Sequence, residues 1–364
     1  MKILYDHQMF LEQKYGGISK YFCELIKNIP ANTDYELSVL FSNNQHLKDE
    51  RGFFKKFHFP LPAKNFKGKG FLKRNFKKLN KTYSEIIISK NNFDLLHPTY
   101  FDPYFLGILK RPYVITIHDL IDFKYKNNST QNSLIPKIQK IVDKANRIIA
   151  ISQNTKKDLV ETMNVDPEKI DVIYHGYNKG FSLKKDSVYG TYILYVGIRE
   201  GYKNFTTFIK AVSLLFEKDI NLRLICVGSP FSKFEMELLK KLNISNRVIA
   251  LGVNENKLNE LYSNALAFVY PSLYEGFGMP ILEAFANNCP VCLSKSSSFP
   301  EIAVEAGSYF DPFDEYSIKE SISKVIYDDN YSKKLIELGS KRLKDFSWKK
   351  CAEETIDSYK KALV

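Results

Sequence analysis

The sequence lacks several features that mark common classes of protein. No apolar run approaches the roughly 20 residues that a membrane-spanning helix needs. The five cysteines are scattered and odd in number, which argues against a disulfide framework and fits a reducing cytoplasm. Neither a Gly-x-Gly-x-x-Gly dinucleotide fingerprint nor an Asp-x-Asp pair for a divalent cation is present. Residues 1–6 form too short an apolar run for a signal peptide and instead predict a strand.

The chain has the length and composition of a soluble protein with two domains. Its 364 residues allow two cores, and 44% hydrophobic and 26% charged residues are ordinary proportions. In each half, short apolar runs typical of strands alternate with helical patterns, and a polar linker near 178–190 separates the halves. We therefore predict an α/β fold of two Rossmann-like domains that face a cleft. Strands are expected at 35–41, 93–97, 113–118, 147–151, 170–174, 192–196, 222–227, 247–251, 266–270 and 291–293, and helices at 18–29, 71–89, 156–163, 204–216, 233–242, 256–262, 280–286 and 347–363.

One stretch of the second half combines a strand, a glycine-rich loop and a helix. In a parallel sheet such a loop lies at the carboxyl end of its strand, where ligands bind. Gly276 and Gly278 let the backbone approach a ligand, and a helix that starts at Pro280 offers unpaired N–H groups to a phosphate. Glu275 and Glu283 flank this anion site. Two carboxylates beside a bound anion are unfavourable unless they bind neutral hydroxyls, and a nucleotide sugar carries both a diphosphate and such hydroxyls. A glycine-containing turn with two solvated glutamates explains the same residues equally well.

The same stretch resembles a known family of enzymes. Glu275 and Glu283 enclose seven residues that include Gly-Phe-Gly-Met-Pro, as in the Glu-x7-Glu signature of retaining GT-B glycosyltransferases of family 4. The resemblance covers nearly the full chain and is weakest over 45–92. It implies the GT-B fold, in which an acceptor-binding domain (1–182) and a donor-binding domain (190–345) face a central cleft. It also implies that the final helix, 348–364, crosses back to the first domain.

The resemblance assigns roles at the donor. The family binds the donor diphosphate with an Arg and a Lys at the spacing of Arg199 and Lys203, although a solvated loop would show the same residues. Glu275 is expected to contact the donor hexose and to steady the charge that develops as the glycosidic bond breaks, and Glu283 to hold the ribose. Further candidates are Gly17, Gly278 and Met279 at the diphosphate, Gly276 and Phe277 at the donor sugar, and, by their position after strands, Gly228, Leu251 and Val253 at the base.

Two predicted strands of the first half end in histidines, His97 and His118. A lone histidine is more often structural than functional, but His118 closes an apolar strand and precedes an acid. The matching histidine of family 4 contacts the donor sugar and lines the acceptor side, so His118 is expected to be catalytic, with a weaker acceptor-side role for Asp119. His97 and Tyr100 are weak candidates for the acceptor pocket, and packing explains His97 at least as well.

The implied activity is transfer of a hexose without a metal or cofactor. Arg199, Lys203 and helix dipoles would stabilise the leaving diphosphate, and the departing phosphate would help to deprotonate the acceptor. The chain resembles bacterial enzymes of O-antigen or capsule assembly, which favours GDP-mannose as donor, UDP-sugars second, and a saccharide or polyprenyl-linked saccharide as acceptor. An epimerase of GT-B fold would bind the same donor without an acceptor. A non-catalytic scaffold would lack one of the charged groups predicted for the donor. It is disfavoured because all four are present, namely Arg199, Lys203, Glu275 and Glu283.

The positive charge of the chain is concentrated in one segment. The net charge is +12, and between Arg51 and Lys81 there are eleven basic residues, seven phenylalanines and no acid. Such a composition predicts docking on anionic lipid, hence a cytoplasmic protein peripheral to the inner face of the cytoplasmic membrane. A solvated helix and loop is the alternative, and a nucleic-acid partner is disfavoured because no reader motif accompanies the segment. The predicted membrane patch comprises Lys55, Lys56, Lys67, Lys69, Lys73, Arg74, Lys77 and Lys78.

Overall fold

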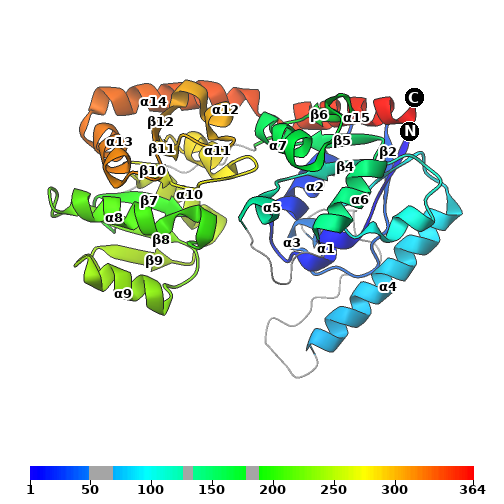
Figure 1. Ribbon diagram of the computed structural model, residues 1–364, viewed down its shortest axis with the longest axis horizontal. Coiled ribbons are helices and arrows are strands. Elements are labelled where there is room, and N and C mark those ends of the chain that lie inside the picture. The colour runs from blue at the N-terminus through cyan, green and yellow to red at the C-terminus, as the bar shows by residue number, and fades with distance from the viewer. Residues whose placement is uncertain (49–68, 126–133, 178–187) are drawn as a thin grey trace. The chain divides into compact units, whose positions relative to one another are not determined.

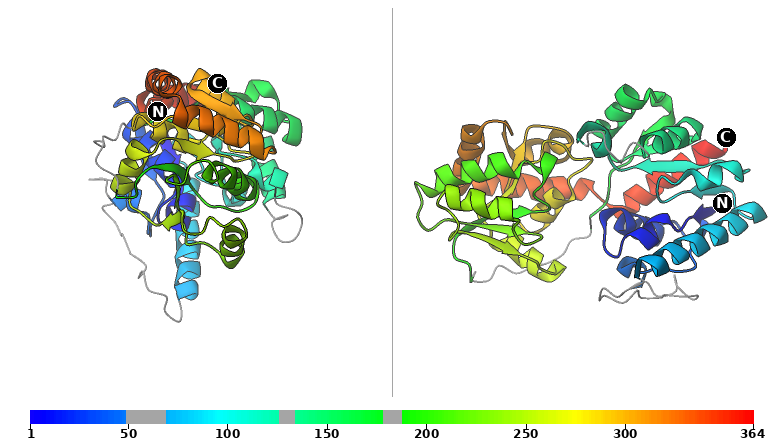
Figure 2. Two further views of the ribbon diagram at one scale, coloured as in Figure 1. Left: turned by 90° about the vertical axis from the view of Figure 1, so that its left-hand side faces the viewer. Right: turned by 60° about the horizontal axis from the view of Figure 1, so that its bottom comes forward.

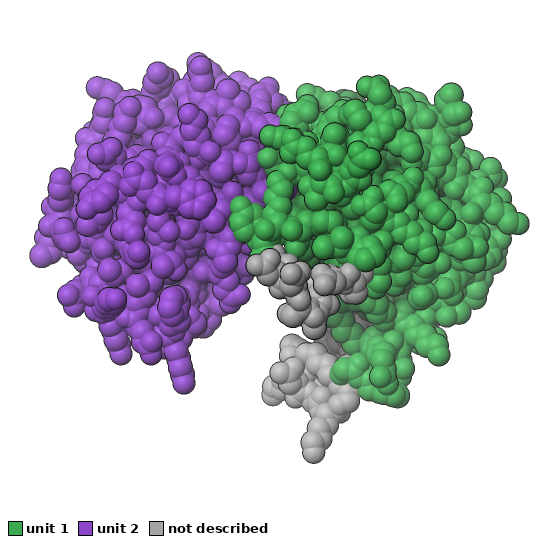
Figure 3. Space-filling view, in the orientation of Figure 1, with its two compact units in different colours: residues 1–176, 347–364 green, residues 177–346 purple. Residues whose placement is uncertain are grey.

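A computed structural model describes residues 1–48, 69–125, 134–177 and 188–364 of the chain (Figure 1). The chain forms two compact units, coloured separately in Figure 3. Unit 1 comprises Met1–Gly176 together with Ser347–Val364, and unit 2 comprises Tyr177–Phe346. The last helix, α15 (Trp348–Leu363), therefore belongs to the first unit, as the resemblance implied. Most of the predicted linker, 178–187, lies outside the described residues.

Unit 1 is built on parallel strands whose carboxyl ends lie together. Its two three-stranded sheets have the orders β2-β1-β3 and β4-β5-β6, and a parallel bridge between Leu96 and Tyr113 connects them. Tyr5 pairs with both Leu37 and His97, so the residues that follow these strands emerge at one edge. The strands are β1 (Lys2–Tyr5), β2 (Asp34–Leu37), β3 (Leu95–His97), β4 (Val114–Ile117), β5 (Arg147–Ala150) and β6 (Ile170–Val172).

Helices cover this sheet because their apolar stripes match its buried faces. Tyr21, Phe22 and Leu25 of α2 pack with Ala352 and Tyr359 of α15 in one core cluster. The 22-residue α4 lies at the periphery of unit 1, in cyan in Figures 1 and 2. The helices of unit 1 are α1 (Gln8–Glu12), α2 (Gly17–Lys27), α3 (Gln45–Lys48), α4 (Lys69–Lys90), α5 (Ile121–Tyr125), α6 (Ile135–Lys144), α7 (Gln153–Met163) and α15, with 3-10 turns η1 (Pro103–Gly107) and η2 (Pro167–Lys169).

Unit 2 contains one six-stranded parallel sheet in the order β12-β11-β10-β7-β8-β9. The chain moves outward in one direction from β7 to β9 and in the other from β10 to β12, so the order reverses between β7 and β10. The crevice beyond the carboxyl ends at such a switch point is where open α/β sheets bind ligands. The strands are β7 (Tyr192–Val196), β8 (Arg223–Val227), β9 (Val248–Leu251), β10 (Phe268–Tyr270), β11 (Val291–Ser294) and β12 (Gly307–Phe310).

The helices of unit 2 lie on both faces of this sheet. They are α8 (Phe205–Phe216), α9 (Lys233–Lys241), α10 (Glu255–Asn264), α11 (Met279–Ala286), α12 (Phe299–Ala303), α13 (Glu315–Tyr327) and α14 (Asp329–Arg342), with 3-10 turns η3 (Gly201–Lys203), η4 (Val304–Ala306) and η5 (Leu343–Asp345). The predicted α/β class with two Rossmann-like domains is confirmed. Within the described ranges, no helix is both long and apolar enough to cross a bilayer.

Candidate functional site

The switch point of unit 2 joins a cation to a carboxylate. Lys203 ends η3, just beyond β7, and Glu275 lies in the loop that follows β10. The Lys203 Nζ lies 2.6 Å from the Glu275 Oε1, and only 12% and 11% of these side chains are exposed. The Lys203 ammonium also lies 5.5 Å from the ring centroid of Tyr270. Because adjacent parallel strands end here, two residues 72 positions apart meet in one ion pair.

The loop that carries Glu275 is held in place by two serines. Ser297 accepts a hydrogen bond from the Glu275 N–H at 3.0 Å and donates to the Glu275 carbonyl at 2.6 Å. Ser298 donates to the carbonyls of Glu275 and Phe277 at 3.0 and 2.9 Å. Gly278 has a φ of +102°, and a Cβ there would lie 3.0 Å from the Ile281 side chain. This position therefore requires glycine, and no side chain caps the helix α11 that it opens.

Glu283 lies one turn into α11, where the sequence placed it. Its Oε2 accepts a hydrogen bond of 3.1 Å from the hydroxyl of Tyr262, a buried residue of α10. Burial, and next the charge of Glu283, raise the pKa of Tyr262 well above its ordinary value, so the tyrosine remains a donor. The Glu283 carboxylate is thus oriented by a neighbouring helix while it stays half-buried at the edge of the sheet.

Arg199 follows the same strand as Lys203 but contacts different partners. Its Nε lies 2.6 Å from the Glu235 Oε1, and its Nη2 donates to the carbonyls of Ser229 and Pro230 at 2.7 and 2.9 Å. Burial raises the pKa of Glu235, but hydrogen bonds from Arg199 and Ser232 outweigh it and bring that pKa below its ordinary value. The buried Arg199 Nη1 has no hydrogen-bond partner among the described residues.

The four charged residues predicted for the donor therefore take part in three separate contacts: Lys203 with Glu275, Arg199 with Glu235, and Glu283 with Tyr262. Arg199 and Glu235 line a cavity of about 360 Å³, whose lining does not include Lys203, Glu275 or Glu283. Arg199 is turned toward the loop after β8 because Glu235 and two carbonyls attract its guanidinium there. The structure thus brings Lys203 and Glu275 into contact and places Arg199 in a separate pairing.

The weaker donor candidates offer a ligand their backbone groups more than their side chains. The ring of Phe277 is buried against Phe346, with centroids 5.8 Å apart, so its side chain is not presented to a ligand. Gly228 has a φ of +153°, and a Cβ there would lie 2.7 Å from the Gly197 carbonyl oxygen, so packing alone explains this glycine. Leu251 and Val253 are half-buried where β9 ends. Gly276 is buried, and Met279, the first residue of α11, is half-buried.

His118 follows β4 in unit 1 and presents a nitrogen without a partner. Its ring stacks on His175 at 5.6 Å and meets the Tyr21 ring edge-on at 5.1 Å. Burial lowers the pKa of His118 to about 3, so the ring is neutral at physiological pH. Its buried Nε2 has no hydrogen-bond partner in the described part of the chain. An unpaired buried polar atom costs about 1–3 kcal/mol, which favours a ligand at this nitrogen.

His97 was predicted either to line the acceptor pocket or to pack in the core. The structure shows packing and corrects the first prediction. The side chain is completely buried, with its Nδ1 2.6 Å from the Tyr359 hydroxyl and its Nε2 2.9 Å from the Thr116 Oγ1. Both ring nitrogens are therefore used within the core. His97 joins α15 to the sheet, a partnership that the sequence conceals because Tyr359 lies 262 residues away.

Asp119 and Gly17 occupy the starts of helices in unit 1. The Asp119 Oδ1 accepts a hydrogen bond of 3.1 Å from the backbone of Ile121 at the first residue of α5. Gly17 opens α2, and a Cβ there would meet nothing within 4 Å. The preceding Gly16 is the constrained residue, since a Cβ there would lie 2.2 Å from the Gln13 Oε1. That Gln13 oxygen already accepts from the Ser19 N–H in the first turn.

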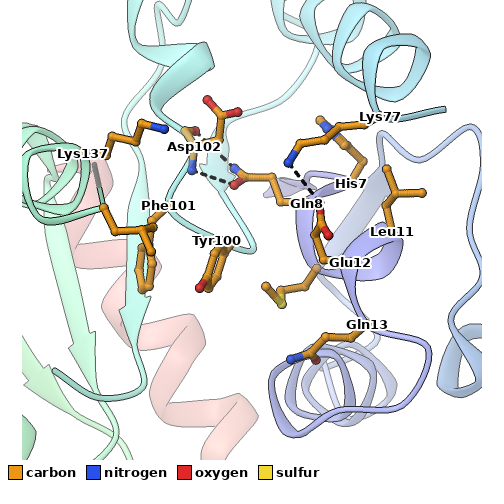
Figure 4. A pocket seen from close by; sticks show the side chains of 12 residues that line it. His7, Gln8, Leu11, Glu12, Gln13, Lys77, Tyr100, Phe101, Asp102 and Lys137 are labelled. Atoms are coloured by element: carbon orange, nitrogen blue, oxygen red, sulfur yellow. Dashed lines mark hydrogen bonds and ion pairs between the residues drawn. The ribbon is translucent and has the colours of Figure 1, made fainter. Parts of the chain in front are cut away.

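A cavity of about 400 Å³ opens beside α1 and is called the unit 1 pocket below (Figure 4). Its walls come from α1, the loop after β3, α4 and α6, and they include the predicted acceptor residue Tyr100. His7, Glu12 and Lys137 of this lining were not predicted from the sequence. No helix was predicted between the strand that ends at residue 6 and the helix at 18–29, whereas the structure shows α1 there. Their position could have indicated a site, because residues 7–13 directly follow β1 at the carboxyl edge of the sheet, where ligands bind.

The predicted membrane patch is described only in part. Lys55, Lys56 and Lys67 lie outside the described residues, and Lys69 opens α4. Lys73 and Lys77 both pair with Glu12, at 2.8 and 2.9 Å. Arg74 lies over the exposed ring of Phe71, and Lys78 is exposed. Among the described residues, no group of three histidine, cysteine, aspartate or glutamate side chains is arranged to hold a metal ion.

Two family models match the chain. The model for Glycosyltransferase Family 4 matches residues 15–180, and the model for Glycosyl transferases group 1 matches residues 184–342. The first match lies almost wholly in unit 1 and the second in unit 2.

Relatives and a solved structure agree with these matches. The sequence is 34% identical over 220 residues to the O-antigen chain mannosyltransferase RfbU of Salmonella typhimurium, covering 60% of this chain and 62% of RfbU, so the match spans less than two thirds of that protein. It is 28% identical over 266 residues to the O-antigen chain mannosyltransferase B of Escherichia coli, covering 68% and 70%. The fold superposes on sucrose-phosphate synthase from Thermosynechococcus elongatus with a TM-score of 0.77 at 18% identity, over 99% of this chain and 98% of that one.

Proposed function

Because the chain belongs to the group 1 and family 4 glycosyltransferases, we propose that it transfers a hexose from a nucleotide-diphosphate sugar to a saccharide or lipid-linked saccharide acceptor during the synthesis of a bacterial surface polysaccharide. Both relatives compared above are named for a role in an O-antigen chain. The activity follows from chemistry that the described residues can perform on such a donor.

The observation that carries the proposal is the contact between Lys203 and Glu275 at the switch point of unit 2. A sugar diphosphate presents negative oxygens on one side of its glycosidic bond and neutral hydroxyls on the other. An ammonium and a carboxylate held side by side match these two halves. The uncapped start of α11 at Gly278 adds backbone N–H donors and a partial positive charge for the phosphate.

The proposed donor is GDP-mannose, with UDP-sugars as the second choice. Two relatives are named as mannosyltransferases, which favours mannose as the transferred sugar. Glu283, oriented by Tyr262, would accept hydrogen bonds from the ribose hydroxyls. A half-buried carboxylate suits these hydroxyls, since each donates a charge-assisted hydrogen bond.

The proposed reaction retains the anomeric configuration and requires no metal. Lys203, the α11 dipole and Arg199, once released from part of its contacts, would stabilise the leaving diphosphate. Glu275 would stabilise the positive charge that develops on the hexose. The departing phosphate would accept the proton of the attacking hydroxyl on the same face. His118 would contact the donor sugar through its neutral, unpartnered Nε2.

We further propose that α4 docks on the anionic inner face of the cytoplasmic membrane. Its inward face joins it to unit 1: Asn80 and Ser84 are completely buried and bind backbone carbonyl or N–H groups of residues 38–41, and Ile88 packs in a core cluster. Its outward apolar side chains, Phe71 and Leu79, are 59% and 48% exposed. Exposed apolar side chains among lysines are the arrangement of a helix that lies in a lipid interface.

A ligand screen tests the donor proposal. The full-length protein is incubated with GDP-mannose, GDP, UDP-glucose and UDP, and its thermal unfolding is recorded. GDP-mannose should raise the Tm more than the UDP-sugars, since a ligand that binds only the folded state stabilises it. Products are then analysed with and without saccharide acceptors. Conversion of the nucleotide sugar to an epimer without an acceptor, or no response to any nucleotide sugar, would contradict the proposal.

A further inference from the structure

The unit 1 pocket has walls that are fixed before a ligand arrives. The Gln8 side chain donates to the Asp6 Oδ2 at 2.7 Å and accepts from the Asp102 N–H at 2.8 Å. Buried Asp6 in turn accepts from the Thr99 hydroxyl at 2.7 Å and the Tyr104 hydroxyl at 3.1 Å. These bonds connect the loop after β1 to the loop after β3. A pocket with preset walls loses less ordering entropy when it binds a ligand.

The hydrogen bonds around His7 determine which of its nitrogens carries the proton. The Ser84 hydroxyl donates its one proton to the Ser38 carbonyl at 2.8 Å. The same Ser84 oxygen lies 2.7 Å from the His7 Nδ1 and must therefore accept from it. Burial lowers the pKa of His7, so the ring is neutral and its Nε2 is unprotonated. That Nε2 is a hydrogen-bond acceptor with no recorded partner among the described residues, on a side chain that lines the pocket.

The charges of the lining balance one another. Glu12 and Asp102 supply two carboxylates, and Lys77 and Lys137 supply two ammonium groups. Glu12 is already engaged by Lys73 and Lys77 at 2.8 and 2.9 Å. Lys77 is thereby neutralised, and the two carboxylates and two ammonium groups of the lining leave it without net charge. The pocket therefore suits an uncharged ligand better than a phosphate.

The remaining wall combines aromatic surface with a hydroxyl group. Tyr100 lines the pocket beside Phe101, and their ring centroids lie 4.6 Å apart (Figure 4). A half-buried tyrosine offers an apolar ring and a polar tip to the same ligand. A pyranose ring likewise has an apolar C–H face and a rim of hydroxyls. The cavity volume falls within the range of about 300–1,000 Å³ that is typical of small-molecule sites.

We propose that the unit 1 pocket binds an uncharged sugar ring of the acceptor, and that the His7 Nε2 accepts a hydrogen bond from one of its hydroxyls. This inference rests on the proposed function and names the part of the acceptor that the described residues recognise. His7 would select a sugar with a hydroxyl at the position it faces, because an analogue without that hydroxyl leaves the nitrogen unpaired.

Nuclear magnetic resonance of the full-length protein with ¹⁵N-labelled histidine tests the pocket without turnover. The probes are methyl glycosides of mannose, galactose, glucose and rhamnose, and mannose 1-phosphate as the anionic counterpart. The His7 signals, identified by their loss in His7→Asn, should show the Nδ1–H form, and a neutral glycoside should shift the Nε2 signal. No shift with any neutral glycoside, or a stronger response to mannose 1-phosphate, would overturn the inference.

Kinetics separate this inference from the function on which it rests. The His7→Asn amide can still donate to Ser84 but lacks the outer nitrogen. It should raise the acceptor KM by about tenfold while donor hydrolysis and donor KM stay unchanged. Half-buried Tyr100→Ala should do the same through the opposite wall, and His46→Asn outside the pocket is the matched control. If both pocket variants transfer the sugar with an unchanged acceptor KM, the sugar-site inference is contradicted but the proposed function is not. If the wild type shows neither transfer nor donor hydrolysis, the proposed function itself is contradicted.

Discussion

The carboxyl edges of the two units handle charge in opposite ways. In unit 2 the functional side chains form buried ion pairs, Lys203 with Glu275 and Arg199 with Glu235. In unit 1 the buried side chains singled out are neutral imidazoles, since burial lowers the pKa of both His118 and His7, and the ion pairs of Glu12 with Lys73 and Lys77 are more exposed than those of unit 2. Ion pairs can rearrange around a charged diphosphate, whereas neutral rings with an open nitrogen bind hydroxyls. Under the proposed function, the comparison places the donor diphosphate at unit 2 and the acceptor hydroxyls at unit 1.

The largest effect is expected where the ion pair of unit 2 is broken. Lys203→Ala removes the proposed phosphate ligand and leaves Glu275 without its cation, so kcat should fall by at least about tenfold. Steady-state kinetics with GDP-mannose measure this. Lys210→Ala is the control, because Lys210 forms a similar but exposed pair with Glu315. A Lys203→Ala rate close to that of wild type would remove the assignment, and Glu275→Ala should behave like Lys203→Ala.

The second ion pair should affect stability and its pH dependence. Glu235→Ala leaves the buried Arg199 guanidinium uncompensated and should lower the free energy of unfolding by about 3 kcal/mol. The pKa of Glu235 is lower in the folded chain than its ordinary 4.5. Its contribution is therefore fully present above pH 4.5 and is lost as the pH falls through the lower folded value. Urea unfolding across this range measures it, and an identical acid response in Glu235→Gln would contradict it.

A smaller effect, on the free energy of unfolding, distinguishes the structural histidine His97 from His118 and His7. Tyr359→Phe removes a hydroxyl bonded to both His97 and Tyr5, so unfolding should become easier by about 1–2 kcal/mol. Turnover should not change, because His97 contacts no open surface. Chemical denaturation and kinetics on the same preparation give both values. A large loss of kcat without a loss of stability would mean that His97 takes part in the reaction.

The smallest effect is expected on the surface of α4. Arg74→Gln with Lys78→Gln should weaken binding to anionic vesicles by about 1 kcal/mol per charge and leave stability within about 0.5 kcal/mol. Flotation with phosphatidylserine-containing and neutral vesicles measures the binding. The double variant Lys333→Gln with Lys334→Gln, which changes two exposed lysines of α14, is the control. Equal, negligible binding of the wild type to both vesicle types would exclude docking through α4.

Local patterns predicted much of the fold, because buried parallel strands and amphipathic helices have distinct periodicities. The loop around Gly278 was predictable for the same reason: strand, glycines and helix follow one another within one stretch. Helix α1 was not predicted, because its five residues are too few to show a helical period, and the unit 1 pocket was therefore not predicted either. Sequence patterns could not reveal the pairing of Arg199 with Glu235 or of His97 with Tyr359, since each depends on where distant segments meet.

The most direct test of the account is a crystal structure of the protein with bound GDP-mannose. The account predicts that a diphosphate oxygen lies about 3 Å from the Lys203 Nζ, that the start of α11 faces the same phosphate, and that Glu275 accepts hydrogen bonds from the hexose hydroxyls. A nucleotide sugar bound elsewhere, with the contact between Lys203 and Glu275 intact, would contradict it.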